Sequence, residues 1–258
     1  MPQARSLLAH FVNKASYSTI ATEMKEYTSP HTAMHKSHRA AWLRAAVLGV
    51  NDGIVSTSSL MLGVLAASQS DKAILTAGIA GLVAGALSMA AGEYVSVSSQ
   101  RDSEKADLAI ERASLTDNPN EELAELTWIY ERRGLNPKLA RQVAQALHAH
   151  DALGAHARDE LGIDHESLAR PVQASVASAT AFSFGAIIPI LAAVIAPSSA
   201  GAIAITVSSL IGLAISGATG AYVGGGHRVF AAARVFVGGG IAMAITYFIG
   251  HLIGGVNL

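Results

Sequence analysis

The stretch VLGVNDGIVSTSSLMLG, residues 47–63, decides the fold of this chain. It lies inside a longer apolar run, Ala45–Ala67, that is long enough to cross a membrane as a helix. A helix rises 1.5 Å per residue, so about 20 residues cross about 30 Å of hydrocarbon. The carboxylate of Asp52 is the exception in this run. An ionisable residue at that depth costs about 2.5–3.5 kcal/mol on insertion scales and tends to mark a pathway.

The composition favours a membrane protein. Of the 258 residues, 51% are hydrophobic and 14% are charged, and the mean hydropathy is +0.37. Soluble domains average about 25% charged residues. The net charge of −1 predicts no nucleic-acid-binding surface, and the absence of cysteine excludes disulfides, cysteine zinc sites and thiolate chemistry.

Five apolar segments are predicted to cross the membrane: Ala45–Ala67, Ile74–Val97, Val172–Ala196, Ala200–Val223 and Val235–Ile253. Between the second and third lies an acidic insert, Arg101–Arg170, with 9 Lys/Arg and 14 Asp/Glu. No strand pattern is present, so the fold class is all-α: a polytopic membrane protein with five transmembrane helices and a three-helix insert. We divide the chain into an N-terminal arm (1–40), spans 1–2 (41–99), the insert (100–171) and spans 3–5 (172–258).

Helix-breaking residues divide the insert. Its first helix continues from the second span to about Leu115, because no Gly or Pro interrupts it. The second begins at Pro119, with Asn118 as the expected cap, and stops at Gly134. The third begins at Asn136–Pro137 and runs to Gly162.

Basic residues predict the orientation. The residues that precede the first apolar segment (1–44), the insert and the segment 224–234 carry 17 of the 18 Lys/Arg, and Lys72 is the exception. The positive-inside rule therefore places these three parts, including the N-terminus, in the cytoplasm and the C-terminus outside.

The second span is predicted to place Met89 at a depth similar to that of Asp52, with polar residues on the same face. Counting from the span ends, Asp52 lies about 10 Å and Met89 about 8 Å from the cytosolic edge. Glu93 follows Met89 by one helical turn, and Ser56, Ser59, Ser96 and Gln100 extend the polar seam. Two alternatives stay open: Asp52 caps a helix broken at Asn51–Gly53, and Met89 only packs. A carboxylate with a thioether favours transition metals over Mg²⁺ and Ca²⁺, so these residues suggest a divalent-metal transporter.

Glycines recur four residues apart on three of the spans. The pairs are Gly49/Gly53, Gly81/Gly85 and Gly220/Gly224. Small residues at this spacing let membrane helices approach closely, within a chain or in a dimer.

Four ordered motifs resemble the vacuolar iron transporter family in its bacterial form. They are LGVNDGIVS, GEYVSVSSQRDSEKADLA, NPNEELAELTWIYERRGL and HARDELGI, within about residues 36–254. The resemblance implies a homodimer that exports Fe²⁺, and often also Mn²⁺, from the cytosol by proton antiport. It implies no permanently bound cofactor and a location in the bacterial inner membrane, without a preceding ferritin-like domain. Asp52 and Met89 would line the path, and a cytosolic site would use Glu104, Glu111, Glu122, Glu125 and Glu160.

The insert departs from the family pattern at two points. Where relatives commonly read RERRELA this chain reads IERASLT, so Ser114 takes a position often held by a ligand glutamate. His156 stands where some members carry methionine. It lies one turn before Glu160, and we include it among the expected metal ligands. The number of ions and the preference between Fe²⁺ and Mn²⁺ stay open.

Other interpretations remain open. Acidic residues at helical spacing usually form only a solvated face. A membrane-tethered metal sensor or storage protein would also carry a metal-binding insert. No glutamate is followed by histidine at i+3, the pattern of di-iron carboxylate bundles, so no enzyme activity is expected. Residues 1–35 have no assigned role.

Overall fold

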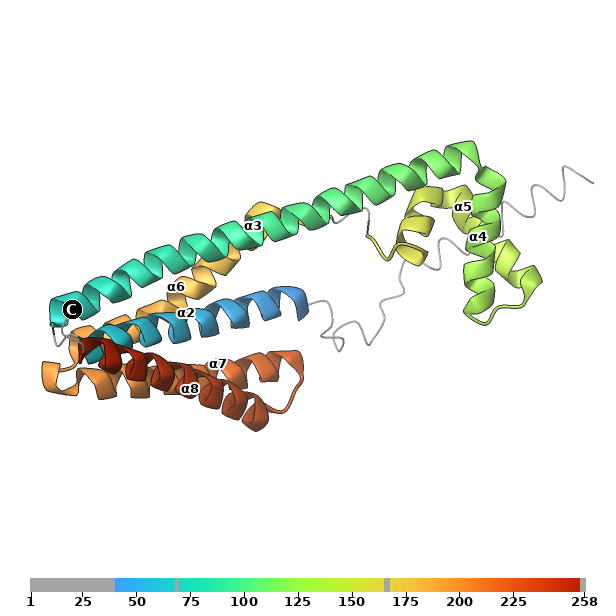
Figure 1. Ribbon diagram of the computed structural model, residues 1–258. Coiled ribbons are helices and arrows are strands. Elements are labelled where there is room, and N and C mark those ends of the chain that lie inside the picture. The colour runs from blue at the N-terminus through green and yellow to red at the C-terminus, as the bar shows by residue number, and fades with distance from the viewer. Residues whose placement is uncertain (1–39, 68–69, 165–167, 256–258) are drawn as a thin grey trace, which may run out of the picture. The chain divides into compact units, whose positions relative to one another are not determined.

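The computed structural model describes residues 40–67, 70–164 and 168–255, and these are helical without β-strands. The arm at residues 1–39 lies outside this part. In chain order the α-helices are α2 (Ala40–Ala67), α3 (Asp71–Asp117), α4 (Pro119–Arg132), α5 (Pro137–Asp159), α6 (Pro171–Ile195), α7 (Gly201–Gly224) and α8 (Arg228–Gly254) (Figure 1). A 3-10 turn, η3 (Ser198–Ala200), precedes α7. The predicted all-α class is confirmed.

Five of these helices are long and apolar enough to cross a membrane: α2, α3, α6, α7 and α8. They coincide with the five predicted spans. Helix α3 is the longest, with 47 residues, and extends without a break from the apolar bundle into the acidic insert (Figure 1). At 1.5 Å per residue it is about 70 Å long, roughly twice the thickness of a hydrocarbon core.

Helix α2 is the central helix of the bundle, because it contacts all four other spans. Gly49 and Gly53 lie against α6, and a methyl group at Gly53 would collide with the carbonyl of Phe182. Gly63 packs against Thr246 of α8, and Ile54 reaches Gly212 of α7. Helix α2 is continuous through Asp52. The alternative of a helix broken at Asn51–Gly53 is therefore wrong.

The recurrent glycines pack within the chain. Gly81 faces Leu60, Gly85 faces the ring of Phe182, and Gly220 faces Val47. The predicted close helix contacts are therefore present among the described spans. They are made inside one chain and give no evidence for a dimer.

Buried apolar side chains join the spans at the end away from the insert. Met61 and Leu62 of α2 pack with Ile74 of α3, Ile205 of α7 and Met243 of α8. At the other end, the hydroxyl of Ser175 donates to the carbonyl of Ala90 at 2.8 Å and links α6 to α3.

The turns of the insert lie at the helix-breaking residues predicted from the sequence. Gly134 has φ +101° after α4, and Gly162 has φ +68° after α5. The side chain of Asn136 caps α5 by accepting from the amide of Leu139 at 3.0 Å. Asn118 precedes α4 as expected, but its side chain forms no capping bond. Its carbonyl accepts from Glu121 and Glu122 instead.

Candidate metal centre

A small apolar core fixes α4 against α5. It consists of buried Leu126, Ala144 and Ala155, with Leu123, Tyr130 and Leu147 packed around them. Because α4 is amphipathic, seating Leu126 in this core turns Glu122, one helical turn earlier, towards the last turns of α5.

Four predicted ligands meet where α3, α4 and α5 converge. They are Glu111 of α3, Glu122 of α4, His156 of α5 and Glu160 just after it, and one ligand atom from each lies within 4.8 Å of all the others. The Nδ1 atom of His156 is 3.0 Å from Oε1 of Glu111, 3.0 Å from Oε2 of Glu160 and 3.7 Å from Oε2 of Glu122. We call these four residues the acidic cluster.

The cluster has more buried acceptors than the protein can satisfy. His156 is completely buried, and Glu111 and Glu122 are 6% and 9% exposed. The single Nδ1–H group of a neutral imidazole can serve one acceptor, and Glu160 lies in hydrogen-bonding position. Oε1 of Glu111 and Oε2 of Glu122 are buried with no hydrogen bond from a described donor. A cation among these atoms would satisfy all of them.

The electrostatics of the cluster also favour a cation. Burial raises the pKa of Glu111, and the carboxylates of Glu160, Glu122 and Glu125 raise it further against the opposing effect of His156. Partial burial and the charges of Glu160 and Glu122 likewise raise the pKa of Glu125. Without a metal ion, Glu111 and Glu125 therefore hold protons more strongly than isolated carboxylates do.

A kink in α5 turns His156 inward. Asp151 has φ −157° and ψ 90°, so the helix is interrupted there, and the Asp151 side chain accepts from the amide of Gly154 at 3.0 Å. This bond caps the second part of α5, in which all residues from Gly154 to Ala157 are buried. The change of direction buries the His156 side chain beside the acids of α3 and α4.

An anchored aspartate holds the end of α5. Asp159 accepts from the Tyr130 hydroxyl at 2.6 Å and pairs with Arg133 at 2.7 Å and Arg158 at 3.3 Å. Burial alone raises the pKa of Asp159, but the Tyr130 hydrogen bond and the two guanidiniums outweigh it and leave that pKa below its ordinary value. Asp159 therefore stays ionised and ties the residue before Glu160 to α4.

The other two predicted metal ligands have different positions. Glu125 is exposed and borders a pocket of about 220 Å³ that Glu111, Glu122 and Glu160 also line. Glu104 is not brought to the acidic cluster. Its Oε2 accepts from the amide of Ala169 at 3.1 Å and its Oε1 accepts from Gln100 at 2.8 Å, so it fastens the chain before α6 to α3.

The structure adds residues that we did not select from the sequence. Asp107 lines the same pocket, and its spacing of one turn before Glu111 could have revealed it. His148 lies edge-on to His156 with 6.0 Å between ring centroids. Nδ1 of His148 and Nε2 of His156 are both buried without a hydrogen-bond partner among the described residues. No local spacing rule signals this pair, because the kink at Asp151 separates them.

The residues expected along the membrane path differ in exposure. Asp52 is exposed on α2, whereas Met89 and Glu93 are half-buried on α3. Phe182 of α6 contacts both Gly53 and Gly85, so it lies between α2 and α3 at this level. Met89, four residues after Gly85, is thus one turn nearer to the insert. The equal depth of Asp52 and Met89 stays a prediction.

Comparison with known proteins identifies the family. The model of the VIT family matches residues 43–251. The chain belongs to the VIT family. It is similar to a vacuolar iron transporter of Acanthamoeba castellanii, with 50% identity over 227 residues that cover 87% of this chain and 84% of the relative. It is also similar to vacuolar iron transporter homolog 1 of Arabidopsis thaliana, at 38% identity over 86% of this chain and 88% of the relative.

Family membership and the five apolar helices establish this VIT-family chain as an integral membrane protein. The two departures noted in its sequence both fall at the site. Ser114 lines the pocket beside Glu111, and His156 contributes the atom closest to the carboxylates of the cluster. Both departures therefore change side chains at the acidic cluster and its pocket.

Proposed function

We propose that this chain transports divalent transition metal, Fe²⁺ and also Mn²⁺, out of the cytosol by proton antiport. The acidic cluster carries the proposal. Three carboxylates and one imidazole suit Fe²⁺ and Mn²⁺, because carboxylates suit manganese and imidazole suits iron. The names of the similar proteins support iron as a substrate.

In this proposal the acidic cluster receives metal on the cytosolic side. The distribution of Lys and Arg supports this side for the insert, with the C-terminus outside. Helix α3 connects the two regions, because it carries Glu111 near one end and the membrane residues Met89 and Glu93 nearer the other. Metal bound by the insert would enter the membrane region along Glu93 and Met89 towards Asp52.

Asp52 supports both a pathway and a homodimer. Leu48, Asp52, Ser56 and Leu60 recur every fourth residue and are all exposed, so they form one stripe along α2. The Ser56 hydroxyl donates to the backbone carbonyl of Asp52 at 2.6 Å, not to its side chain. The Asp52 carboxylate has no hydrogen bond or ion pair from a described residue. A carboxylate facing lipid is costly, so we propose that a second copy covers this stripe and that the two Asp52 residues face a shared path.

An exchangeable proton on Asp52 would couple the fluxes. Metal that binds from the cytosolic side displaces the proton from the carboxylate. After the metal leaves on the other side, the carboxylate takes up a proton from that side and returns to its protonated state. Cycling between these two states exchanges metal for protons. The carboxylate is essential to this exchange, whereas the thioether of Met89 only selects the metal.

Proteoliposomes test the proposal. Purified protein is reconstituted with a pH-sensitive dye inside, and Fe²⁺ is added without oxygen. Transport predicts saturable Fe²⁺ uptake with proton movement in the opposite direction. The Asp52→Asn variant should lose at least tenfold in rate, and Asp52→Glu should retain more. Metal binding to the protein without uptake into the vesicles would instead indicate a tethered sensor or storage protein.

Reporter fusions test the orientation independently. A reporter inserted at Asn118 should be cytosolic, and one fused after Leu258 should be external. A cytosolic reporter at the C-terminus would contradict the proposed five-span topology.

A further inference from the structure

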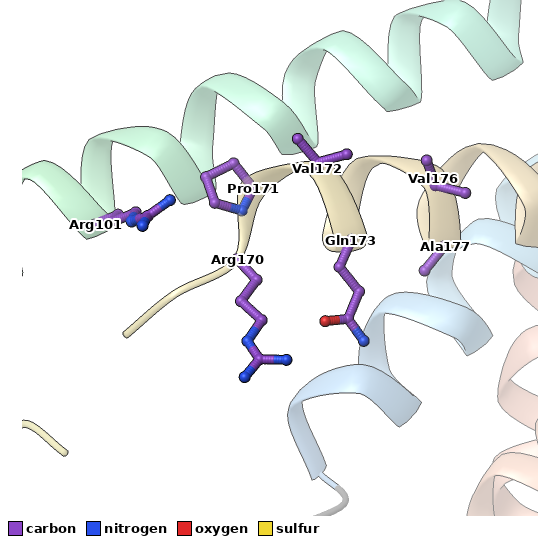
Figure 2. Close-up of a pocket in the computed structure, with 7 residues that line it drawn as sticks. All are labelled: Arg101, Arg170, Pro171, Val172, Gln173, Val176 and Ala177. Carbon is purple, nitrogen blue, oxygen red and sulfur yellow. The ribbon is translucent and has the colours of Figure 1, made fainter. Parts of the chain in front are cut away.

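A groove lies beside the start of α6, outside the proposed metal pathway. Its volume is about 670 Å³, and it is lined by Arg101 of α3, by Arg170 and by the first residues of α6 (Figure 2). Pro171, Val172, Val176 and Ala177 make the lining mostly apolar. The side chains of Val172 and Val176 are 67% and 60% exposed, although they are one helical turn apart on the same face of a membrane helix.

The two arginines that border the groove have no partner among the described residues. The ion pairs of the described arginines involve Arg133 and Arg158. Glu104, one turn after Arg101 on α3, is occupied by the amide of Ala169 and by Gln100. In Figure 2, Arg170 and Gln173 extend on the same side of α6. Two guanidinium groups and a carboxamide therefore offer donors without a matching acceptor.

The position of the groove matches the surface of a membrane. Arg101 directly follows the apolar part of α3, and Arg170 directly precedes the apolar helix α6. The groove is thus at the insert end of both spans, where the apolar segments end and lipid headgroups are expected. Its valines continue along α6 into the hydrocarbon region. No side chain caps the start of α6, so its first amides add to the positive potential there.

We propose that this groove binds one anionic phospholipid from the leaflet on the insert side. The phosphate would lie between Arg101 and Arg170, within reach of the Gln173 carboxamide. One acyl chain would cover Val172 and Val176. Guanidinium groups match phosphate geometry with paired hydrogen bonds, and basic pockets between membrane helices are established headgroup sites.

The bound lipid would stabilise the junction between the insert and the bundle. Arg170 follows Ala169, whose amide is held by Glu104 of α3. A phosphate shared by Arg101 and Arg170 would fasten the same two segments a second time. This role is independent of metal transport, because it involves neither the acidic cluster nor Asp52.

Native mass spectrometry of the full-length protein in detergent tests the proposal. We expect one tightly bound phosphatidylglycerol and at least tenfold weaker binding of phosphatidylcholine, whose headgroup has no net charge. The Arg101→Gln/Arg170→Gln variant should lose this preference. The Arg228→Gln/Arg234→Gln variant removes the same charge from the start of α8 and should keep it. Unchanged preference in the first variant, or equal loss in both, would overturn the site.

Two further measurements distinguish a phospholipid site from a site that binds phosphate alone. Val176→Trp fills the apolar part and keeps both arginines, so it should also lower phosphatidylglycerol binding at least tenfold. Soluble glycerol phosphate should compete poorly, because it has no acyl chain. Competition by glycerol phosphate at the concentration of the lipid would show a simple phosphate site and contradict the proposal. Gel filtration and circular dichroism of each variant establish that it is folded.

Discussion

The Nδ1 atom of His156 lies 3.0 Å from Oε1 of Glu111, although the two residues belong to helices on opposite sides of α4 in the sequence. Both side chains are almost fully buried. The Nδ1 atom of His156 is already in hydrogen-bonding position to Glu160, and Oε1 of Glu111 has no hydrogen-bond partner among the described residues, whereas a divalent cation among these atoms would satisfy both carboxylates. This contact makes the insert a metal site rather than a solvated acidic surface in our proposal.

Loss of one cluster carboxylate should weaken metal binding. Glu122→Gln keeps the shape of the side chain but removes a buried charge, so we expect at least tenfold lower affinity for Mn²⁺ in calorimetric titration of the full-length protein. Glu121→Gln is the matched control, because Glu121 is the neighbouring residue and is exposed. Equal heats for wild type and both variants would leave only a solvated acidic face.

The cluster should respond to pH in two opposite ways. The raised pKa values of Glu111 and Glu125 mean that protons compete with metal above the ordinary carboxylate range, so affinity should fall as the pH decreases from neutral. Without metal, the folded insert binds protons more strongly than the unfolded one. Its stability should therefore increase as the pH falls through the raised pKa values.

The contribution of Asp159 to the stability of the insert should change with pH in the opposite direction, at lower pH. Its pKa is lowered in the folded insert, so its contribution is present above its unfolded pKa and is lost as the pH falls through the folded value. Hydrogen exchange of α4 and α5 amides, corrected for the intrinsic rate, measures both effects. Stability of the metal-free insert that falls steadily from pH 7 to pH 5 would contradict the assignment.

Restoring a glutamate in the pocket should strengthen binding. Ser114 lines the pocket with Glu111, Glu122, Glu125 and Glu160. The Ser114→Glu variant adds a carboxylate there, and we expect a several-fold gain in Mn²⁺ affinity or one more bound ion. Ser114→Gln adds similar volume without charge and should not reproduce the gain.

The Tyr130–Asp159 hydrogen bond should position the cluster without binding metal. Tyr130→Phe removes a 2.6 Å bond to a charged acceptor, which costs about 1.5–3 kcal/mol locally. We expect faster hydrogen exchange at the end of α5 and a moderate fall in metal affinity. Saturating metal should restore slow exchange, since the ion itself links the helices. Unaltered exchange would show that Asp159 is held by Arg133 and Arg158 alone.

Met89 should influence selectivity more than rate. Met89→Leu removes the thioether with little change in volume, so Fe²⁺ transport should persist while discrimination against Mg²⁺ weakens. Competition by Mg²⁺ in the proteoliposome assay measures this. Leu87→Met, at an exposed position on the same helix, is the control and should leave selectivity unchanged.

The sequence determined the elements of this protein because their signals are local. Apolar segments of sufficient length predict the five spans, and Pro119, Gly134, Asn136 and Pro137 define the helices of the insert. These signals depend only on neighbours within a turn or two. The resemblance to the vacuolar iron transporter family supplied Glu111, Glu122 and Glu160 as expected ligands, and the spacing to Glu160 added His156; the structure brings these four together.

The tertiary structure decided which of these faces meet. Glu104 shares a face of α3 with Glu111, yet it binds the chain before α6, because that segment packs two turns away from the cluster. Phe182 lies between α2 and α3 because glycines on both helices leave room for α6. The kink at Asp151, which buries His156, involves neither Gly nor Pro. Such contacts join residues far apart in the chain, and local spacing carries no information about them.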